Sequence, residues 1–337
     1  MIKPSSFKPA WWLPGPHLQT LWPVFSWAKK KPTTIRQRLE LADGDFIDLD
    51  WVNQNLNAPI IVILHGLEGS VNSHYVRDML YTLQQLNYRA VLMHFRGCSG
   101  EINRKPRYYH SGDTADLQCV IEVLQQRYPQ TPLGAIGYSL GGNVLLKWLG
   151  ETGTNNPLHC AVAVSVPMLL NKSADRMQHG FSRFYQWYLI KQLKQKFLKK
   201  ERKMLLPIEA EMKNIHDFWS FDDKVTAPLH SFKSAEEYYQ KSSSRQYLKS
   251  IAIPTLIIHA ADDPFTDTSI IPDADELSSS VTLELSTTGG HVGFITGAIP
   301  GFGKSWLLQR IPDFIQEIFM ESNYAETKSN YYPKSTD

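Results

Sequence analysis

Short apolar runs alternate with longer segments of helical length along most of the chain. Each run is rich in Val, Ile and other apolar residues without polar interruptions, so we predict strands that are buried on both faces. Buried strands separated by helices indicate a parallel sheet built from crossover units. We therefore predict an α/β fold, a mostly parallel twisted sheet with helices on both faces. The predicted strands are residues 60–64, 90–95, 133–137, 161–166 and 255–259.

The segment before these runs has a different hydrophobic pattern. Residues 35–52 contain a turn signal at 42–45, and the second half places Ile47, Leu49 and Trp51 at alternate positions. Alternation around a Gly-containing turn is typical of two antiparallel strands. We predict that this pair precedes the parallel part of the sheet.

The strand pattern stops after Val166 and resumes at Ile253. The intervening residues hold aromatic and basic segments with helical spacing, such as 181–190 and 235–239. An insertion of about 80 residues is too long for a simple connection. We predict a helical cap at residues 168–250 over one edge of the sheet, a discontinuous core at residues 1–167 and 251–324, and a loose polar tail at residues 325–337.

Composition and charge exclude several classes of protein. The 337 residues are 42% hydrophobic and carry a formal net charge of +2, so a disordered chain and a protein with a strong overall attraction to nucleic acid are excluded. One local exception is the basic run at residues 191–203, with seven positive residues and one negative. It predicts either peripheral contact with an anionic membrane or a solvated helix face that packs Leu193, Phe197 and Leu198 inward.

Three cysteines, Cys98, Cys119 and Cys160, are too few and too widely spaced for a disulfide framework or a thiolate zinc site. The N-terminus lacks the unbroken apolar stretch of a signal peptide, and no run of about 18 apolar residues occurs. We expect a soluble, cytoplasmic protein. Phosphate-binding, dinucleotide-binding and zinc-protease motifs are missing, so we expect no cofactor and no metal. The oligomeric state does not follow from the sequence.

The clearest chemical signal is Gly137-x-Ser139-x-Gly141, which lies between a predicted strand and a predicted helix. In this position the glycines allow a sharp turn that projects the serine hydroxyl above the sheet at a helix N-terminus. The pattern alone is weak, but the strand before it and the helix after it strengthen it. We predict that Ser139 is a nucleophile.

A serine nucleophile needs a base, and the hydrolase fold expects the order Ser, acid, His along the chain. His291 is the only histidine beyond residue 260 and lies in a glycine-rich loop after the apolar strand at residues 281–285. Asp262 and Asp263 follow the strand at 255–259. We choose Asp263 as the acid, because the following proline favours an extended conformation at the loop tip; Asp262 stays an alternative.

An oxyanion hole would complete this constellation. The first buried strand continues into His65-Gly66-Leu67. In this fold the residue after His-Gly has a backbone N–H that faces the nucleophile and can donate to the oxyanion. We therefore predict that the N–H groups of Leu67 and Leu140 bind the oxyanion. For His65 we predict a role in bracing the loop. The paired carboxylates Asp222 and Asp223 are expected to make capping bonds or ion pairs, so we assign them no site.

These residues resemble the YheT-type branch of the α/β-hydrolases, whose eukaryotic relatives include membrane-tethered lipases and phospholipases and yeast medium-chain ethyl ester synthase/esterases. The resemblance covers nearly the whole chain and is carried by six stretches, which are His65–Ser70, Arg96–Gly100, Pro106–Thr114, Gly137–Asn143, Phe221–His230 and Ala261–Phe265, together with the segment around His291. By resemblance, Ser139, Asp263 and His291 take the triad positions. The eukaryotic relatives carry an N-terminal membrane anchor, and we expect none here, which weakens transfer of a membrane phospholipid substrate.

The resemblance implies hydrolysis of carboxylic esters, with short- to medium-chain acyl groups expected, through an acyl-enzyme on Ser139. A small-molecule ester would be the partner. Two alternatives stay open: an acyltransferase that passes the same acyl group to an alcohol, and an inactive hydrolase fold that serves as a binding protein.

Overall fold

Buried apolar strands form the centre of the protein. The computed structural model describes residues 1–25, 32–53, 55–204 and 212–331. Within them, nine strands form one sheet in the order β1-β9-β8-β7-β6-β4-β5-β3-β2. Only β3 runs antiparallel to its neighbours β2 and β5; the other pairs are parallel. The strands are β1 (Ile2–Pro4), β2 (Ile35–Glu40), β3 (Phe46–Val52), β4 (Ile60–Leu64), β5 (Arg89–Met93), β6 (Leu133–Tyr138), β7 (Cys160–Val164), β8 (Thr255–Ala260) and β9 (Val281–Ser286).

The predicted strands are confirmed, including the antiparallel pair β2 and β3 around the turn at 42–45. The edge strand β1 was not predicted. It has three residues, too few for a periodic pattern, and it exists because Ile2 pairs with Leu283 of β9. A short hairpin of β10 (Ile295–Thr296) and β11 (Lys304–Ser305) was also missed for the same reason.

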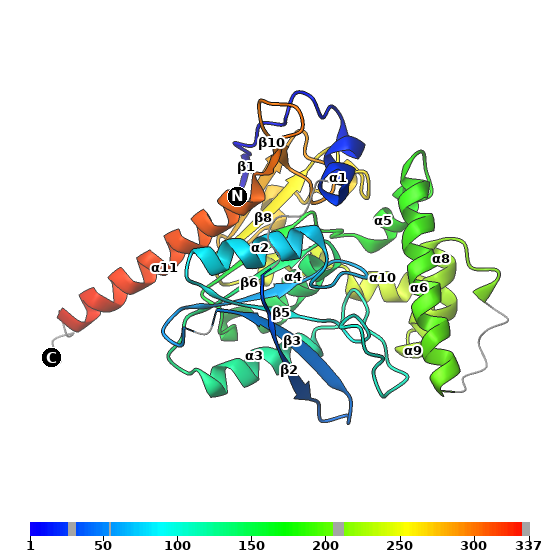
Figure 1. The fold of residues 1–337 in the computed structure, drawn as a ribbon, viewed down its shortest axis with the longest axis horizontal. Coiled ribbons are helices and arrows are strands. Elements are labelled where there is room, and N and C mark those ends of the chain that lie inside the picture. Colours follow the sequence, from blue (N-terminus) through cyan, green and yellow to red (C-terminus); the bar gives the residue numbers. More distant parts are fainter. Residues whose placement is uncertain (26–31, 54, 205–211, 332–337) are drawn as a thin grey trace.

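Helices cover both faces of the sheet, as predicted (Figure 1). In β4, Val62 packs into the core on one face, whereas Ile61 and Ile63 pack into the core on the other. Apolar residues at every position therefore require cover on both sides. One face is covered by α3 (Ala115–Arg127) and α4 (Leu140–Thr152), and the other by α2 (His74–Gln85) and α11 (Leu307–Tyr331).

Most of the described residues between β7 and β8 lie in helices. Figure 1 shows α6, α8 and α9 gathered at one end of the molecule, beyond the sheet. Cap residues share a cavity with Ser139, which follows β6, so the insertion lies over the carboxyl ends of the strands. Its elements are α5 (Leu170–Arg176), α6 (Ser182–Met204), α8 (Phe218–Phe221), the π-helical turn η2 (Asp222–Thr226), α9 (Ala227–Leu229), α10 (Ala235–Ser242) and the 3₁₀ helix η3 (Arg245–Ser250).

The basic run lies on the second half of α6. Leu193 and Phe197 are buried in the cap, which agrees with the solvated-helix interpretation. Several lysines are directed back to the protein: Lys196 Nζ lies 2.8 Å from Glu68 Oε2, and Lys200 Nζ donates to the carbonyl of Arg107. Fewer positive charges are therefore free for a membrane than the sequence suggests, and peripheral contact through residues 191–203 stays a prediction.

The C-terminal end differs from the expectation of a loose tail. Residues 325–331 continue α11 as helix, and residues 332–337 lie outside the described residues. A helix that is anchored by the buried Ile311, Ile315 and Phe319 can propagate into a polar sequence, because each added residue gains a backbone hydrogen bond. None of the described helices is long and apolar enough to span a membrane. The three cysteines are free thiols.

Candidate active site

Ser139 occupies a strained turn between β6 and α4. Its φ is 51° and its ψ is −118°, a backbone conformation that non-glycine residues rarely adopt. The turn is held by a hydrogen bond from the Ser139 N–H to the carbonyl of Val164, 2.8 Å away. The result is a serine side chain that projects beyond the carboxyl end of the sheet, as the sequence motif predicts.

The two glycines of the motif are required by contact with neighbouring backbone. A Cβ on Gly137 would lie 2.6 Å from the carbonyl oxygen of Gly141, and a Cβ on Gly141 would lie 2.5 Å from that of His65. Both positions have ordinary negative φ, so the constraint is space and not conformation. Close packing of the turn against the loop after β4 therefore excludes any side chain at these positions.

Ser139, His291 and Asp263 form a continuous hydrogen-bonded chain. His291 Nε2 lies 3.0 Å from Ser139 Oγ, and His291 Nδ1 lies 2.8 Å from Asp263 Oδ2 and 3.1 Å from Oδ1. With a proton on Nδ1, the ring donates to the carboxylate and leaves Nε2 free to accept the serine proton. The structure thus brings together the three residues chosen from the sequence, although they come from widely separated loops.

The two neighbouring aspartates have different partners. Asp263 is buried, faces His291 and accepts a hydrogen bond from the N–H of Phe265. Asp262 instead accepts one from the N–H of Gly290, 3.0 Å away. Asp262 therefore braces the loop that carries His291, whereas Asp263 contacts the imidazole itself. This geometry favours Asp263 over the alternative that the sequence left open.

The surroundings shift the pKa values of these two carboxyl groups in opposite directions. Burial opposes ionisation of Asp263, but the adjacent His291 ring and its hydrogen bond hold the pKa of Asp263 below its ordinary value. Burial raises the pKa of Asp262, and the hydrogen bond from Gly290 only partly offsets it. The charged form of Asp263 is thus the one that the imidazole stabilises.

The N-terminal segment braces the His291 loop, which the sequence argument missed. Thr20 of α1 (Pro16–Phe25) accepts a hydrogen bond from the His291 N–H at 2.9 Å. A Cβ on Gly290 would lie 2.5 Å from the carbonyl oxygen of Pro16, and one on Gly293 would collide with that of Gln19. The glycines near His291 therefore leave the space that the backbone of α1 occupies. No local pattern in the sequence indicated this contact, because Thr20 and His291 lie 271 residues apart.

Leu67 and Leu140, the two residues predicted to form the oxyanion hole, line the same cavity as Ser139. Leu140 is the first residue of α4, so its N–H has no partner within the helix. Among the described residues no acceptor is seen for the Leu67 N–H. The Leu67 loop is fixed on both sides, because the Gly66 N–H donates to Tyr75 Oη and the Glu68 N–H donates to Tyr109 Oη.

His65 braces this loop, as expected. It is fully buried, its Nδ1 lies 2.7 Å from the carbonyl oxygen of Gly66, and its Nε2 accepts from the N–H of Phe95. Burial lowers the pKa of His65 to about 3. The ring is therefore neutral, which fits a role as hydrogen-bonding support for the loop.

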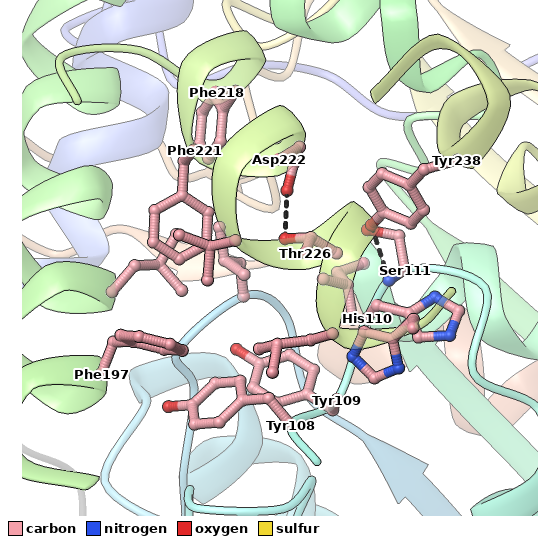
Figure 2. A pocket seen from close by; sticks show the side chains of 16 residues that line it. Tyr108, Tyr109, His110, Ser111, Phe197, Phe218, Phe221, Asp222, Thr226 and Tyr238 are labelled. Carbon is pink, nitrogen blue, oxygen red and sulfur yellow. Dashed lines mark hydrogen bonds between the residues drawn. The ribbon is translucent and has the colours of Figure 1, made fainter. Parts of the chain in front are cut away.

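Two adjoining cavities open beside Ser139. The first, about 530 Å³ including space open to solvent, is lined by Ser139 and by cap residues such as Leu170 and Met177. The second, about 540 Å³, extends under the cap and is the pocket in Figure 2. Five residues line both cavities and so mark their junction: Leu67, Ser111, Leu140, Phe218 and Asp222.

The second cavity has one apolar and one polar side. Figure 2 shows Phe197, Phe218 and Phe221 on one side and Tyr238 with His110 on the other. The rings of His110 and His230 are in contact, tilted by 57° with centroids 4.4 Å apart. Burial is the main cause that lowers the pKa of both rings, that of His230 to about 4. Within the described part of the chain no group of three or more His, Cys, Asp or Glu side chains is arranged to hold a metal ion.

Comparison with known proteins agrees with this fold. A family model described as "alpha/beta hydrolase fold" matches residues 59–298. The chain belongs to the α/β hydrolase family. This α/β hydrolase is 43% identical to YheT of Escherichia coli (strain K12), which is named as an esterase, and the match covers 93% of this chain and 92% of YheT.

More distant similarities include a phospholipase and a solved esterase structure. Phospholipase ABHD3 of Mus musculus is 31% identical and covers 88% of this chain and 75% of its own. Among solved structures, the Pyrococcus furiosus esterase Pf2001 has a TM-score of 0.58 at 19% identity, covering 85% of this chain and 91% of that chain. That likeness shows a shared fold. The relatives extend the family assignment over nearly the whole length of this α/β hydrolase.

Proposed function

We propose that this α/β hydrolase is a serine esterase that cleaves carboxylic esters, expected to have short- to medium-chain acyl groups. The observation that carries the proposal is the hydrogen-bonded chain from Ser139 through His291 to Asp263, with the serine on a strained turn that faces a cavity. The names of the relatives, an esterase and a phospholipase, support ester hydrolysis as the shared chemistry.

The mechanism follows from the geometry. Ser139 Oγ attacks the ester carbonyl while His291 Nε2 takes its proton, and Asp263 stabilises the resulting imidazolium without accepting the proton. The carbonyl oxygen becomes an oxyanion that accepts hydrogen bonds from the N–H groups of Leu67 and Leu140. The imidazolium then protonates the departing alcohol. Water, activated by the same ring, hydrolyses the acyl-enzyme and restores Ser139.

The cavity beside Ser139 supports an apolar acyl group. Its walls include Leu170, Met177, Leu189 and Phe265, which offer no hydrogen bonds and favour hydrocarbon. The free state of all three thiols supports the expected cytoplasmic location.

The decisive experiment uses purified protein and a chain-length series of p-nitrophenyl esters, with Ser139→Ala as the control. We expect hydrolysis that peaks between short and medium chains and labelling of the wild type, but not of Ser139→Ala, by a fluorophosphonate probe. Equal and weak labelling of both proteins would leave only an inactive binding protein. Excess alcohol in the assay separates the acyltransferase alternative, which predicts mainly the new ester.

A further inference from the structure

A half-buried carboxylate lies at the junction of the two cavities. Asp222 is the first residue of the π-helical turn η2 and lines both spaces, one of which contains Ser139. Figure 2 shows its side chain at the roof of the second cavity. Its sequence neighbour Asp223 behaves as the sequence predicted, because it is exposed and accepts a hydrogen bond from the Ala235 N–H. Asp222 therefore needs a separate explanation.

Only neutral groups bind this carboxylate. Thr226 Oγ1 donates to Oδ1 at 2.6 Å, and Tyr239 Oη donates to Oδ2 at 2.7 Å. Among the described residues no Lys or Arg forms an ion pair with Asp222. Burial raises the pKa of Asp222 to about 6, with the two hydrogen bonds opposing the rise. We call the two adjoining cavities together the cleft. Above that pH the cleft holds a negative charge without a counterion.

The rest of the cleft does not compensate this charge. No Lys or Arg is among the described residues that line either cavity. The two histidines of the second cavity, His110 and His230, have lowered pKa values and so are neutral near pH 7. A group that binds phosphate or carboxylate needs positive charge or several directed N–H donors. The cleft offers a fixed negative charge instead.

We propose that Asp222 is a specificity-determining residue, which makes the cleft accept esters without a negative charge, such as acylglycerols and alkyl esters, and reject esters that carry a phosphate or carboxylate close to the scissile bond. This inference rests on the proposed esterase function and names its substrate class. The same charge acts on the product, because the fatty acid released by hydrolysis is an anion. Asp222 thereby weakens product rebinding.

The first test compares two esters with the same acyl chain on the wild-type protein. The probes are 1-octanoylglycerol and 1-octanoylglycerol 3-phosphate, both below their micellar concentrations at pH 7.5, with release of octanoate as the readout. A charge repulsion across several ångströms at an effective dielectric constant near 20 predicts kcat/KM at least about 30-fold lower for the phosphate ester. Equal rates would overturn the inference. Failure to hydrolyse either ester would instead remove the proposed function.

The second test removes the negative charge of Asp222. In Asp222→Asn we expect the ratio of kcat/KM between the two esters to narrow by about tenfold, because the phosphate ester gains more than 1-octanoylglycerol. Octanoate should also inhibit this variant more strongly than the wild type. Asp223→Asn is the matched control, because it removes the neighbouring exposed carboxylate and leaves the hydrogen bonds of Asp222 in place, and it should retain the wild-type ratio.

An independent variant covers the case in which Asp222→Asn does not fold. Leu229 also lines the second cavity, so Leu229→Lys would place a positive charge in the same space. We expect a relative gain for the phosphate ester in this variant. Asp222→Asn and Leu229→Lys proteins that are folded yet keep the full wild-type preference would overturn the assignment.

Discussion

The ring of Phe265 stacks on the imidazole of His291, with centroids 3.8 Å apart and planes 1° from parallel. Phe265 itself packs against Tyr185 of α6, 5.0 Å between centroids. His291 is therefore held at three points: Asp263 binds Nδ1 of the ring, Thr20 binds the backbone N–H, and the ring of Phe265 covers one face of the imidazole. The cap reaches the proposed catalytic base through this ring.

This stacking predicts a rate effect for Phe265→Ala. Loss of an aromatic pair of about 1 kcal/mol lets the imidazole leave its productive orientation, so kcat should fall by about five- to tenfold. KM should change less. Steady-state kinetics on a p-nitrophenyl ester test this, and Phe265→Tyr, which keeps the ring, should retain most of the rate. An unchanged kcat in Phe265→Ala would show that stacking does not position His291.

The two aspartates should differ strongly in their effect on the reaction. Asp263→Asn should lower kcat by about 10⁴-fold, because an amide beside Nδ1 favours the wrong tautomer of the imidazole. Asp262→Asn leaves the Gly290 N–H with an amide oxygen as acceptor and should cost less than about tenfold. Single-turnover acylation rates of both variants measure the difference. Equal losses would contradict the assignment of Asp263 as the triad acid.

The glycine motif predicts a stability effect that does not depend on chemistry. A Cβ on Gly141 would press on the carbonyl of His65, so Gly141→Ala should lower the free energy of unfolding by about 2–3 kcal/mol. Gly134→Ala in β6 is the control, because its Cβ would meet the flexible end of Ile61 at 3.1 Å. That change should cost less than about 1 kcal/mol. Urea denaturation followed by tryptophan fluorescence gives both values.

Buried His65 predicts a pH effect on stability. Its folded-state pKa is lowered to about 3 by burial, against an ordinary value of 6.5. Between these values the unfolded chain binds a proton that the folded chain does not, so His65 makes the protein less stable as the pH falls below 6.5. His65→Gln removes this contribution. The stability difference between wild type and variant should therefore narrow by about 2 kcal/mol from pH 7 to pH 5, measured by urea denaturation at each pH.

Local pattern was sufficient for the buried strands and for Ser139. Strands such as β4 are apolar at every position, and the motif at Ser139 needs only residues within a few positions of it. The edge strand β1 could not be predicted, because three residues carry no period and its existence depends on pairing with β9. Thr20 was missed for a related reason, since its contact with His291 joins positions 271 residues apart.

Asp222 marks the limit of inference from residue type. In the sequence it is one of two adjacent carboxylates, and the expectation of a capping bond is correct for Asp223 but not for Asp222. The structure separates them, because the π-helical turn directs one side chain to Tyr239 and the cavities and leaves the other exposed.

By itself the sequence determined the α/β fold, the helical nature of the insertion, and a serine, an acid and a histidine in hydrolase order. These features depend on local periodicity and on short motifs. Only the tertiary structure favoured Asp263 over Asp262, brought α1 and Phe265 to His291, and placed Asp222 where two cavities meet. Those relationships depend on long-range packing, which sets distances between loops that the chain itself leaves unrestricted.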